Sequence, residues 1–70
     1  MDIDSLKARI ESNPEDYEAL ESYAIALSDI GENEEALKNF IILKDKFPEN
    51  AKNYYNIGII LEKLTMNNEA

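Results

Sequence analysis

The chain has 70 residues and contains neither cysteine nor histidine. The absence of cysteine excludes disulfide bonds and thiol nucleophiles. Together the two absences exclude zinc fingers, Ser-His-Asp triads and imidazole general bases. An enzyme built from this chain would have to use carboxylates, tyrosines or lysines alone. We therefore expect no metal, no cofactor and no catalytic activity.

Long hydrophobic runs are also missing. The first ten residues, MDIDSLKARI, lack the apolar segment of a signal peptide. No other run approaches the roughly 18 apolar residues that a membrane-spanning helix needs. We expect a cytoplasmic protein with no membrane partner.

Glycine and proline are scarce, with two of each, and both prolines fall between helical patterns. Hydrophobic residues make up 44% of the chain, which is ordinary for a globular protein and too many for a disordered one. These features predict a single all-helical domain over residues 1–70. A domain of this size has a small core and is marginally stable.

Basic residues are few, and the formal net charge is −8. Residues 1–35 hold eleven Asp and Glu against Lys7 and Arg9, which gives −9, whereas residues 36–70 hold four acids against five lysines, which gives +1. Phosphate binding needs clustered Lys and Arg, so we expect no nucleic-acid partner. A basic protein or peptide is compatible with this charge. The alternative is that the acids only solvate helix surfaces.

Apolar residues recur at spacings of three and four, which predicts four helices. We expect them over residues 2–12, from Pro14 to Ile30, from the residue after Asn33 to Phe47, and from Asn50 to Leu64. The stretch at 67–70 resembles the first turn of a fifth.

Polar residues and one glycine set the expected helix ends. Asp2 or Asp4, Asn13 and Asn33 are suited to cap the first three helices, and Gly31 to end the second. In the fourth helix, Thr65 stands where Gly31 stood.

The chain repeats itself at an offset of 34 residues. Seven of the 36 residue pairs at this offset are identical. They are Pro14/Pro48, Glu15/Glu49, Ile25/Ile59, Leu27/Leu61, Asn33/Asn67, Glu35/Glu69 and Ala36/Ala70. A helix-turn-helix unit of this length resembles the tetratricopeptide repeat family.

That family places a large aromatic, Leu-Gly and Tyr on the first helix, and Ala, an aromatic and Pro on the second. The matching residues are Leu20, Tyr23-Ala24, Leu27, Ala36, Phe40 and Pro48, then Tyr54, Ile57-Gly58, Leu61 and Ala70. The resemblance implies a right-handed stack of antiparallel helix-turn-helix repeats. It comprises a half repeat or N-terminal cap at 2–12, a full repeat at 17–50 and a partial repeat at 51–70.

The resemblance also implies a non-catalytic module that binds a peptide or a partner helix in a concave groove. The groove residues on the second predicted helix are Glu18, Glu21, Ile25, Ser28 and Asp29. Those on the fourth are Lys52, Tyr55, Ile59, Glu62 and Lys63. Glu18 with Lys52 and Asp29 with Lys63 could instead form ion pairs, each contributing about 0–1 kcal/mol.

The alternative function is self-assembly through the C-terminal end of the stack, as a homodimer or a scaffold. Part of an apolar set on the fourth helix would face water there, and large apolar patches usually mark contacts. The candidate end-face residues are Ile57, Ile60, Leu61 and Leu64, with Ile41 and Ile42 from the third helix. The chain could also be a fragment of a longer tetratricopeptide protein.

Overall fold

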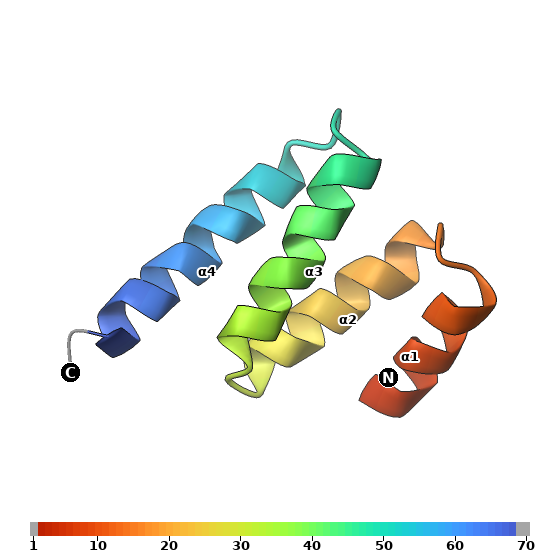
Figure 1. The fold of residues 1–70 in the computed structure, drawn as a ribbon, viewed down its shortest axis with the longest axis horizontal. Helices are drawn as coiled ribbons and strands as arrows, with labels where there is room; N and C mark the ends of the chain where they lie inside the picture. The colour runs from red at the N-terminus through yellow and green to blue at the C-terminus, as the bar shows by residue number, and fades with distance from the viewer. Residues whose placement is uncertain (1, 69–70) are drawn as a thin grey trace.

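The computed structural model describes residues 2–68, which form four helices. They are α1 (Ile3–Ser12), α2 (Tyr17–Asp29), α3 (Asn33–Lys46) and α4 (Lys52–Asn68). Figure 1 shows them side by side in chain order, each running opposite to the one before. The main packing contacts join neighbours in the chain: α1 with α2, α2 with α3, and α3 with α4. The predicted all-α stack of helical hairpins is confirmed.

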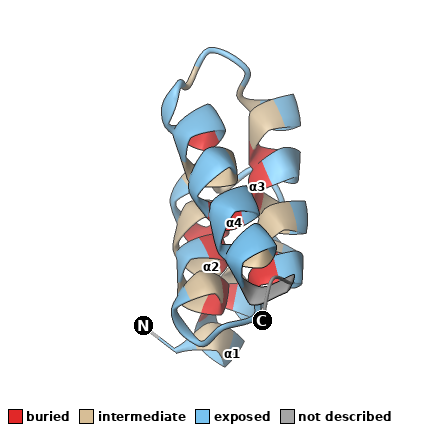
Figure 2. Cartoon of the chain, turned by 90° about the vertical axis from the view of Figure 1, so that its left-hand side faces the viewer, coloured by how far each residue is buried: buried red, intermediate tan, exposed pale blue. Residues whose placement is uncertain are grey.

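The core lies where α2 and α3 face each other and where α4 covers them. It is formed by Leu20, Ala24, Leu27, Ala36, Phe40, Leu43 and Ile60. Figure 2 shows the buried residues on the sides of the helices that face one another. Leu6 on α1 is also buried. Ala24 and Ala36 are fully buried between α2 and α3. Their small methyl groups let the axes of these two helices approach closely.

The start of α2 differs from the sequence prediction. The Asn13 side chain accepts from the Glu15 amide at 3.2 Å and closes a turn, so the helix begins at Tyr17 rather than at Pro14. Asp16 is the cap, and its Oδ1 accepts from the Ala19 amide at 3.1 Å. That hydrogen bond, together with the Arg9 guanidinium at 3.1 Å, lowers the pKa of the Asp16 carboxyl. As predicted, Asp2 caps α1 through the Ser5 amide.

Gly31 ends α2, as predicted, with a φ of 87°. The Gly31 amide donates to the Ser28 carbonyl and the Glu32 amide donates to the Leu27 carbonyl, at 3.1 and 2.8 Å. This is a Schellman motif, which requires a left-handed residue at this position. The predicted cap of α3 was wrong. Glu32, whose amide donates in that motif, occupies the N-cap position, and Asn33 is the first residue of the helix.

The C-terminal end of α4 also corrects the prediction. Thr65 does not act as Gly31 does, since a residue with a Cβ atom resists the left-handed conformation. The helix runs through Thr65 to Asn68 and begins at Lys52, after an Asn50 side chain that accepts from the Lys52 amide. No fifth helix begins at residue 67. The last two residues of that predicted turn lie outside the described part.

The two glycines predict opposite stability changes. Gly31→Ala should lower the free energy of unfolding by about 1–2 kcal/mol, because alanine is strained at a φ of 87°. Gly58 is helical, and a Cβ atom there meets nothing within 4 Å. Gly58→Ala should therefore raise the free energy of unfolding by about 1 kcal/mol. Urea unfolding of dilute protein, followed by circular dichroism, measures both. Two changes of the same sign would contradict this assignment.

Candidate functional site

The surface shared by α2 and α4 is the candidate binding surface. Side-chain hydrogen bonds join the two helices near both ends. Near their N-termini, Tyr17 Oη lies 3.4 Å from Asn53 Oδ1. Near their C-termini, Lys63 Nζ donates to Ser28 Oγ at 2.9 Å. The two helices therefore run parallel and side by side, as a 34-residue repeat requires.

A hollow of about 260 Å³ lies between these helices. Its lining residues are Ile25, Ser28 and Asp29 from α2, Asn56, Ile59 and Ile60 from α4, and Phe40 from α3. Four of the predicted groove residues, Ile25, Ser28, Asp29 and Ile59, are thus brought together. Ile25 and Ile59 are both exposed although they line the hollow. Its apolar side chains and single carboxylate form a small pocket, which suits a side chain with both an apolar part and a charged part.

A second hollow, of about 350 Å³, lies on the α1 side of the same helix. It is lined by Leu6, Ser22, Ile25, Ala26 and Asp29. Ile25 and Asp29 line both hollows. They therefore form a ridge between the two. The sequence prediction did not include this second hollow, because it placed no binding residue on α1.

The remaining predicted groove residues are more scattered. Glu21 accepts from Tyr17 Oη at 3.3 Å, and Glu18 lies 3.8 Å from the Arg9 guanidinium of α1. Lys52, Tyr55 and Glu62 are exposed on α4. Within residues 2–68, none of the ion pairs joins Glu18 to Lys52 or Asp29 to Lys63. The two ion pairs that the sequence suggested are therefore absent: α1 supplies the partner of Glu18, and Lys63 reaches Ser28.

The sequence prediction missed a polar network between the two repeats. Asn50 Nδ2 donates to Tyr17 Oη at 2.6 Å, and Asn53 Nδ2 donates to the Phe47 carbonyl at 3.5 Å. The rings of Tyr17 and Phe47 meet edge to face, with centroids 4.9 Å apart. Burial, and then the nearby Glu21 carboxylate, raises the pKa of Tyr17. The network fixes α4 against α2, so it positions the surface that the two helices share.

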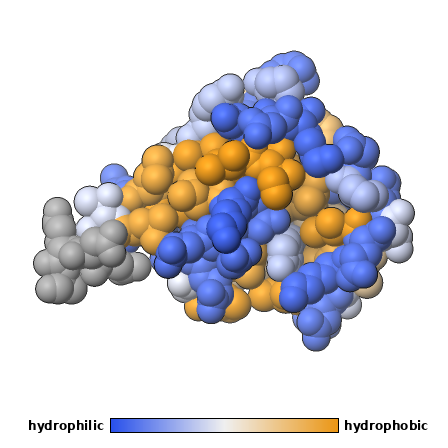
Figure 3. All heavy atoms as spheres, in the orientation of Figure 1, coloured by the Kyte–Doolittle hydropathy of each residue, from blue (hydrophilic) through white to orange (hydrophobic). Residues whose placement is uncertain are grey.

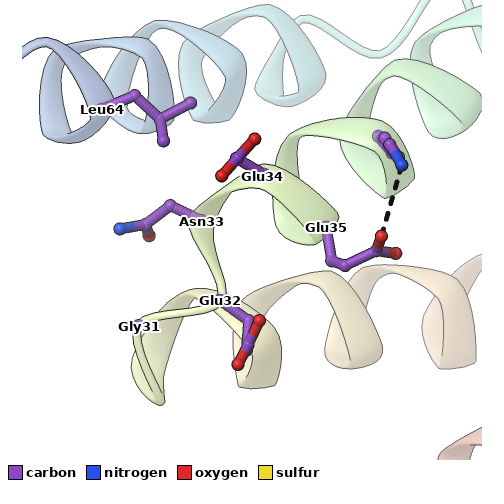
Figure 4. A pocket seen from close by; sticks show the side chains of 7 residues that line it. Gly31, Glu32, Asn33, Glu34, Glu35 and Leu64 are labelled. Carbon is purple, nitrogen blue, oxygen red and sulfur yellow. Dashed lines mark hydrogen bonds and ion pairs between the residues drawn. The ribbon is translucent and has the colours of Figure 1, made fainter. Parts of the chain in front are cut away.

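The turn between α2 and α3 borders a further hollow, of about 400 Å³, shown in Figure 4. The side chains of Glu32, Glu34 and Glu35 point in different directions, and Glu35 accepts from Lys38 at 3.3 Å. Asn33 Oδ1 is buried there without a hydrogen-bond partner. Nowhere in residues 2–68 do three acidic side chains lie close enough to hold a metal ion.

The predicted end-face residues separate into three groups. Ile60 is 2% exposed and belongs to the core, so its place on the end face was predicted wrongly. It packs inward because α3 covers that side of α4. Leu61, Ile41 and Ile42 are exposed, and Ile57 and Leu64 are half-buried. Figure 3 shows the apolar surface as a strip along α4, with hydrophilic surface on both sides.

The repeated hairpin, the buried small residues and the parallel α2 and α4 agree with one family. A family model described as tetratricopeptide repeat matches residues 1–53. The chain belongs to the tetratricopeptide repeat family. No curated protein and no solved structure matches the chain. Tetratricopeptide repeats are generally non-catalytic modules that bind other proteins, and this membership indicates that role here.

The family match covers α1, α2 and α3 and ends at residue 53, the second residue of α4. Most of the second, partial repeat therefore rests on the 34-residue offset and on the parallel packing of α4 beside α2. No helix of the described part of the chain is both long and apolar enough to cross a membrane.

Proposed function

We propose that this tetratricopeptide module binds a basic, partly apolar segment of a partner protein along α2 and α4. The observation that carries the proposal is the ridge of Ile25 and Asp29 between two adjacent hollows. An apolar side chain fits against Ile25 and Ile59, and a basic side chain fits beside the exposed Asp29 carboxylate. This is how groove-binding modules combine apolar anchors with charge selection.

The charge around the groove favours a basic occupant. Glu18 and Glu21 lie on the same helix as Asp29, within the half of the chain that carries −9. Lys63 keeps its positive charge while it donates to the neutral Ser28 hydroxyl. Together with Lys52 it offsets only part of the negative charge of the four groove acids, which are Glu18, Glu21, Asp29 and Glu62. Only two helices line the groove, so the contact area is small and the affinity should be weak, with a Kd of about 10–500 μM.

The proposal predicts that reversing one charge weakens binding. The probe is a 12-residue peptide of alternating Lys and Leu, with a second peptide that has Glu in place of Lys. Nuclear magnetic resonance titration should show shifts at Ile25, Asp29 and Ile59 with the Lys peptide only. Asp29→Lys should raise its Kd about tenfold, which corresponds to about 1.4 kcal/mol.

Asp45→Lys is the matched control, because Asp45 is an exposed acid on α3 that does not line either hollow. It makes the same change in net charge and should change the Kd less than twofold. Equal losses in the two variants would show only a long-range effect of net charge. Equal binding of the Glu peptide, or shifts away from α2 and α4, would refute the proposed groove.

A further inference from the structure

The two hollows beside α2 are the same feature in successive repeats. Four of the residues that line the α2–α4 hollow have counterparts 34 positions earlier in the chain, and all four counterparts line the hollow on the α1 side. The pairs are Phe40/Leu6, Asn56/Ser22, Ile59/Ile25 and Ile60/Ala26. The groove therefore presents one kind of hollow twice, as a repeat architecture would. We call the second one the α1–α2 hollow.

The repeat also sets the distance between the two hollows. Equivalent points in successive repeats are separated by the step from α2 to α4. These helices are neighbours, because Lys63 of α4 donates to Ser28 of α2. Neighbouring helices with their side chains are about 10 Å apart. A ligand that fills both hollows therefore needs two side chains about 10 Å apart on one of its faces, with the ridge of Ile25 and Asp29 between them.

A polyproline II helix has this spacing. It rises about 3.1 Å per residue with three residues per turn, so side chains i and i+3 point the same way about 9.3 Å apart. On one face of a β-strand, side chains are about 6.7 Å apart or twice that distance, and neither value fits. On an α-helix, residues i and i+7 are about 10.5 Å apart, but those at i+3 and i+4 point the same way and would meet the ridge.

The two hollows differ in room and in charge. The α2–α4 hollow has Ile60 where the α1–α2 hollow has Ala26, and their volumes are about 260 and 350 Å³. Asp29 is the only charged residue that lines either hollow. In the α2–α4 hollow its charge is offset by Lys63, which donates to Ser28 in the lining. The α1–α2 hollow therefore suits the long apolar stem and the charged end of a basic side chain, and the α2–α4 hollow suits an apolar one.

On the basis of the binding function proposed above, we propose that the partner segment crosses α2 in the polyproline II conformation. A basic side chain enters the α1–α2 hollow, with its charge beside Asp29, and an apolar side chain three residues away enters the α2–α4 hollow. The acidic first half of the chain, which carries −9, favours the basic side chain. A proline-rich segment adopts this conformation before it binds, so it loses little conformational entropy, and contact with two small hollows is enough for weak binding.

Two peptides of identical length, composition and charge test the spacing on the unmodified chain. In PPKPPLPPKPPL each Lys and the next Leu are three residues apart, whereas in PKPLPPPKPLPP no Lys and Leu are three apart. The first peptide should bind with a Kd about tenfold lower than that of the second. Its nuclear magnetic resonance titration should shift Ser22 and Ala26 in the α1–α2 hollow as well as Ile59 in the α2–α4 hollow.

Ala26→Ile tests the α1–α2 hollow directly. It gives this hollow the residue that Ile60 supplies in the other one, so it fills the space that the basic side chain needs. With unchanged circular dichroism, this variant should bind PPKPPLPPKPPL about tenfold more weakly than the parent and should bind PKPLPPPKPLPP within twofold of the parent. Ala8→Ile is the matched control, because Ala8 is exposed on α1 and lines neither hollow. It should leave both Kd values within twofold.

The outcomes separate this proposal from the binding function on which it rests. Equal Kd values for the two proline peptides, shifts confined to one hollow, or an Ala26→Ile variant that binds as the parent does would overturn the crossing geometry. Binding of the alternating Lys and Leu peptide at Ile25, Asp29 and Ile59 without binding of either proline peptide would overturn it too, and would leave the groove function standing. If none of the three peptides binds, the groove function fails and the crossing geometry fails with it.

Discussion

Phe40→Ala should lower the free energy of unfolding by about 3–5 kcal/mol, the largest loss we expect from any single core change. Phe40 is 2% exposed and lies in the core between α2 and α4. Phe40 also lines the α2–α4 hollow. Truncation removes contacts to both helices at once and leaves a cavity that this thin stack cannot easily close.

The small size of the domain makes that loss decisive. A 70-residue core rarely supplies more than about 3–5 kcal/mol of net stability. The Phe40→Ala variant should therefore be largely unfolded at 25 °C, with most of its helical circular dichroism lost. Ile42→Ala is the matched control, since Ile42 lies on the same helix and is 42% exposed. It should cost less than about 1 kcal/mol. A folded Phe40→Ala protein would show that the core lies elsewhere.

The 34-residue repeat predicted the fold because each helix needs only its chain neighbours. Leu20, Ala24, Ala36 and Phe40 match the family pattern in the sequence, and the structure buries all four. The same repeat predicted that Ile25 and Ile59 lie on one surface, and in the structure both line one hollow. Equal positions in successive repeats lie side by side on parallel helices.

The sequence prediction failed where local hydrogen bonds decide the outcome. Asn13 could cap a helix or close a turn, and only the position of Arg9 beside Asp16 shows why the turn is preferred. The fourth helix was predicted to end at Leu64, before the position equivalent to Gly31, but Thr65 at that position lacks the backbone freedom of Gly31. Ile60 was placed on an outer face because the pattern of α4 is apolar over a wide arc. The packing of α3 decides which side of that arc is buried.

Asn53 shows a further reason why the sequence prediction was incomplete. Periodicity distinguishes apolar from polar positions, so an asparagine on the inner face of α4 gives no signal of burial. The structure places it at 0% exposure, with its hydrogen-bond partners on α2 and at the end of α3. Those partners are 36 and 6 residues away in the chain. Buried polar groups are stable only when they are hydrogen-bonded, so this residue makes the contact between repeats specific.

Asn53→Asp should therefore destabilise the fold by about 3 kcal/mol at pH 7. The change replaces a donor with a carboxylate oxygen, so the Phe47 carbonyl loses its donor and faces an anion. Tyr17 Oη can donate to only one acceptor, and Glu21 competes for it at 3.3 Å. Asn13→Asp is the matched control, because Asn13 is exposed and its Oδ1 only accepts, from the Glu15 amide. That variant should remain within about 0.5 kcal/mol of the parent.

The pH dependence separates this cause from a simple packing defect. Burial raises the pKa of the new carboxyl in the folded state above its unfolded value of about 3.9. The penalty should therefore be small below pH 4, where both states are protonated, and should grow as the pH rises toward 7. The caps Asp2 and Asp16 act in the opposite direction. Because their pKa values are lowered, their stabilisation is present above about pH 4 and is lost as the pH falls.

That loss is common to parent and variant, so the difference between the two unfolding free energies isolates Asn53. Urea unfolding from pH 3.5 to 7.5, with sucrose added to keep both proteins folded, measures this difference. It should increase steadily with pH for Asn53→Asp and stay flat for Asn13→Asp. A large but pH-independent loss would mean that the site is damaged by shape alone. A loss below 1 kcal/mol at pH 7 would mean that water reaches Asn53, and that the two repeats are held together by apolar packing rather than by the Tyr17 network.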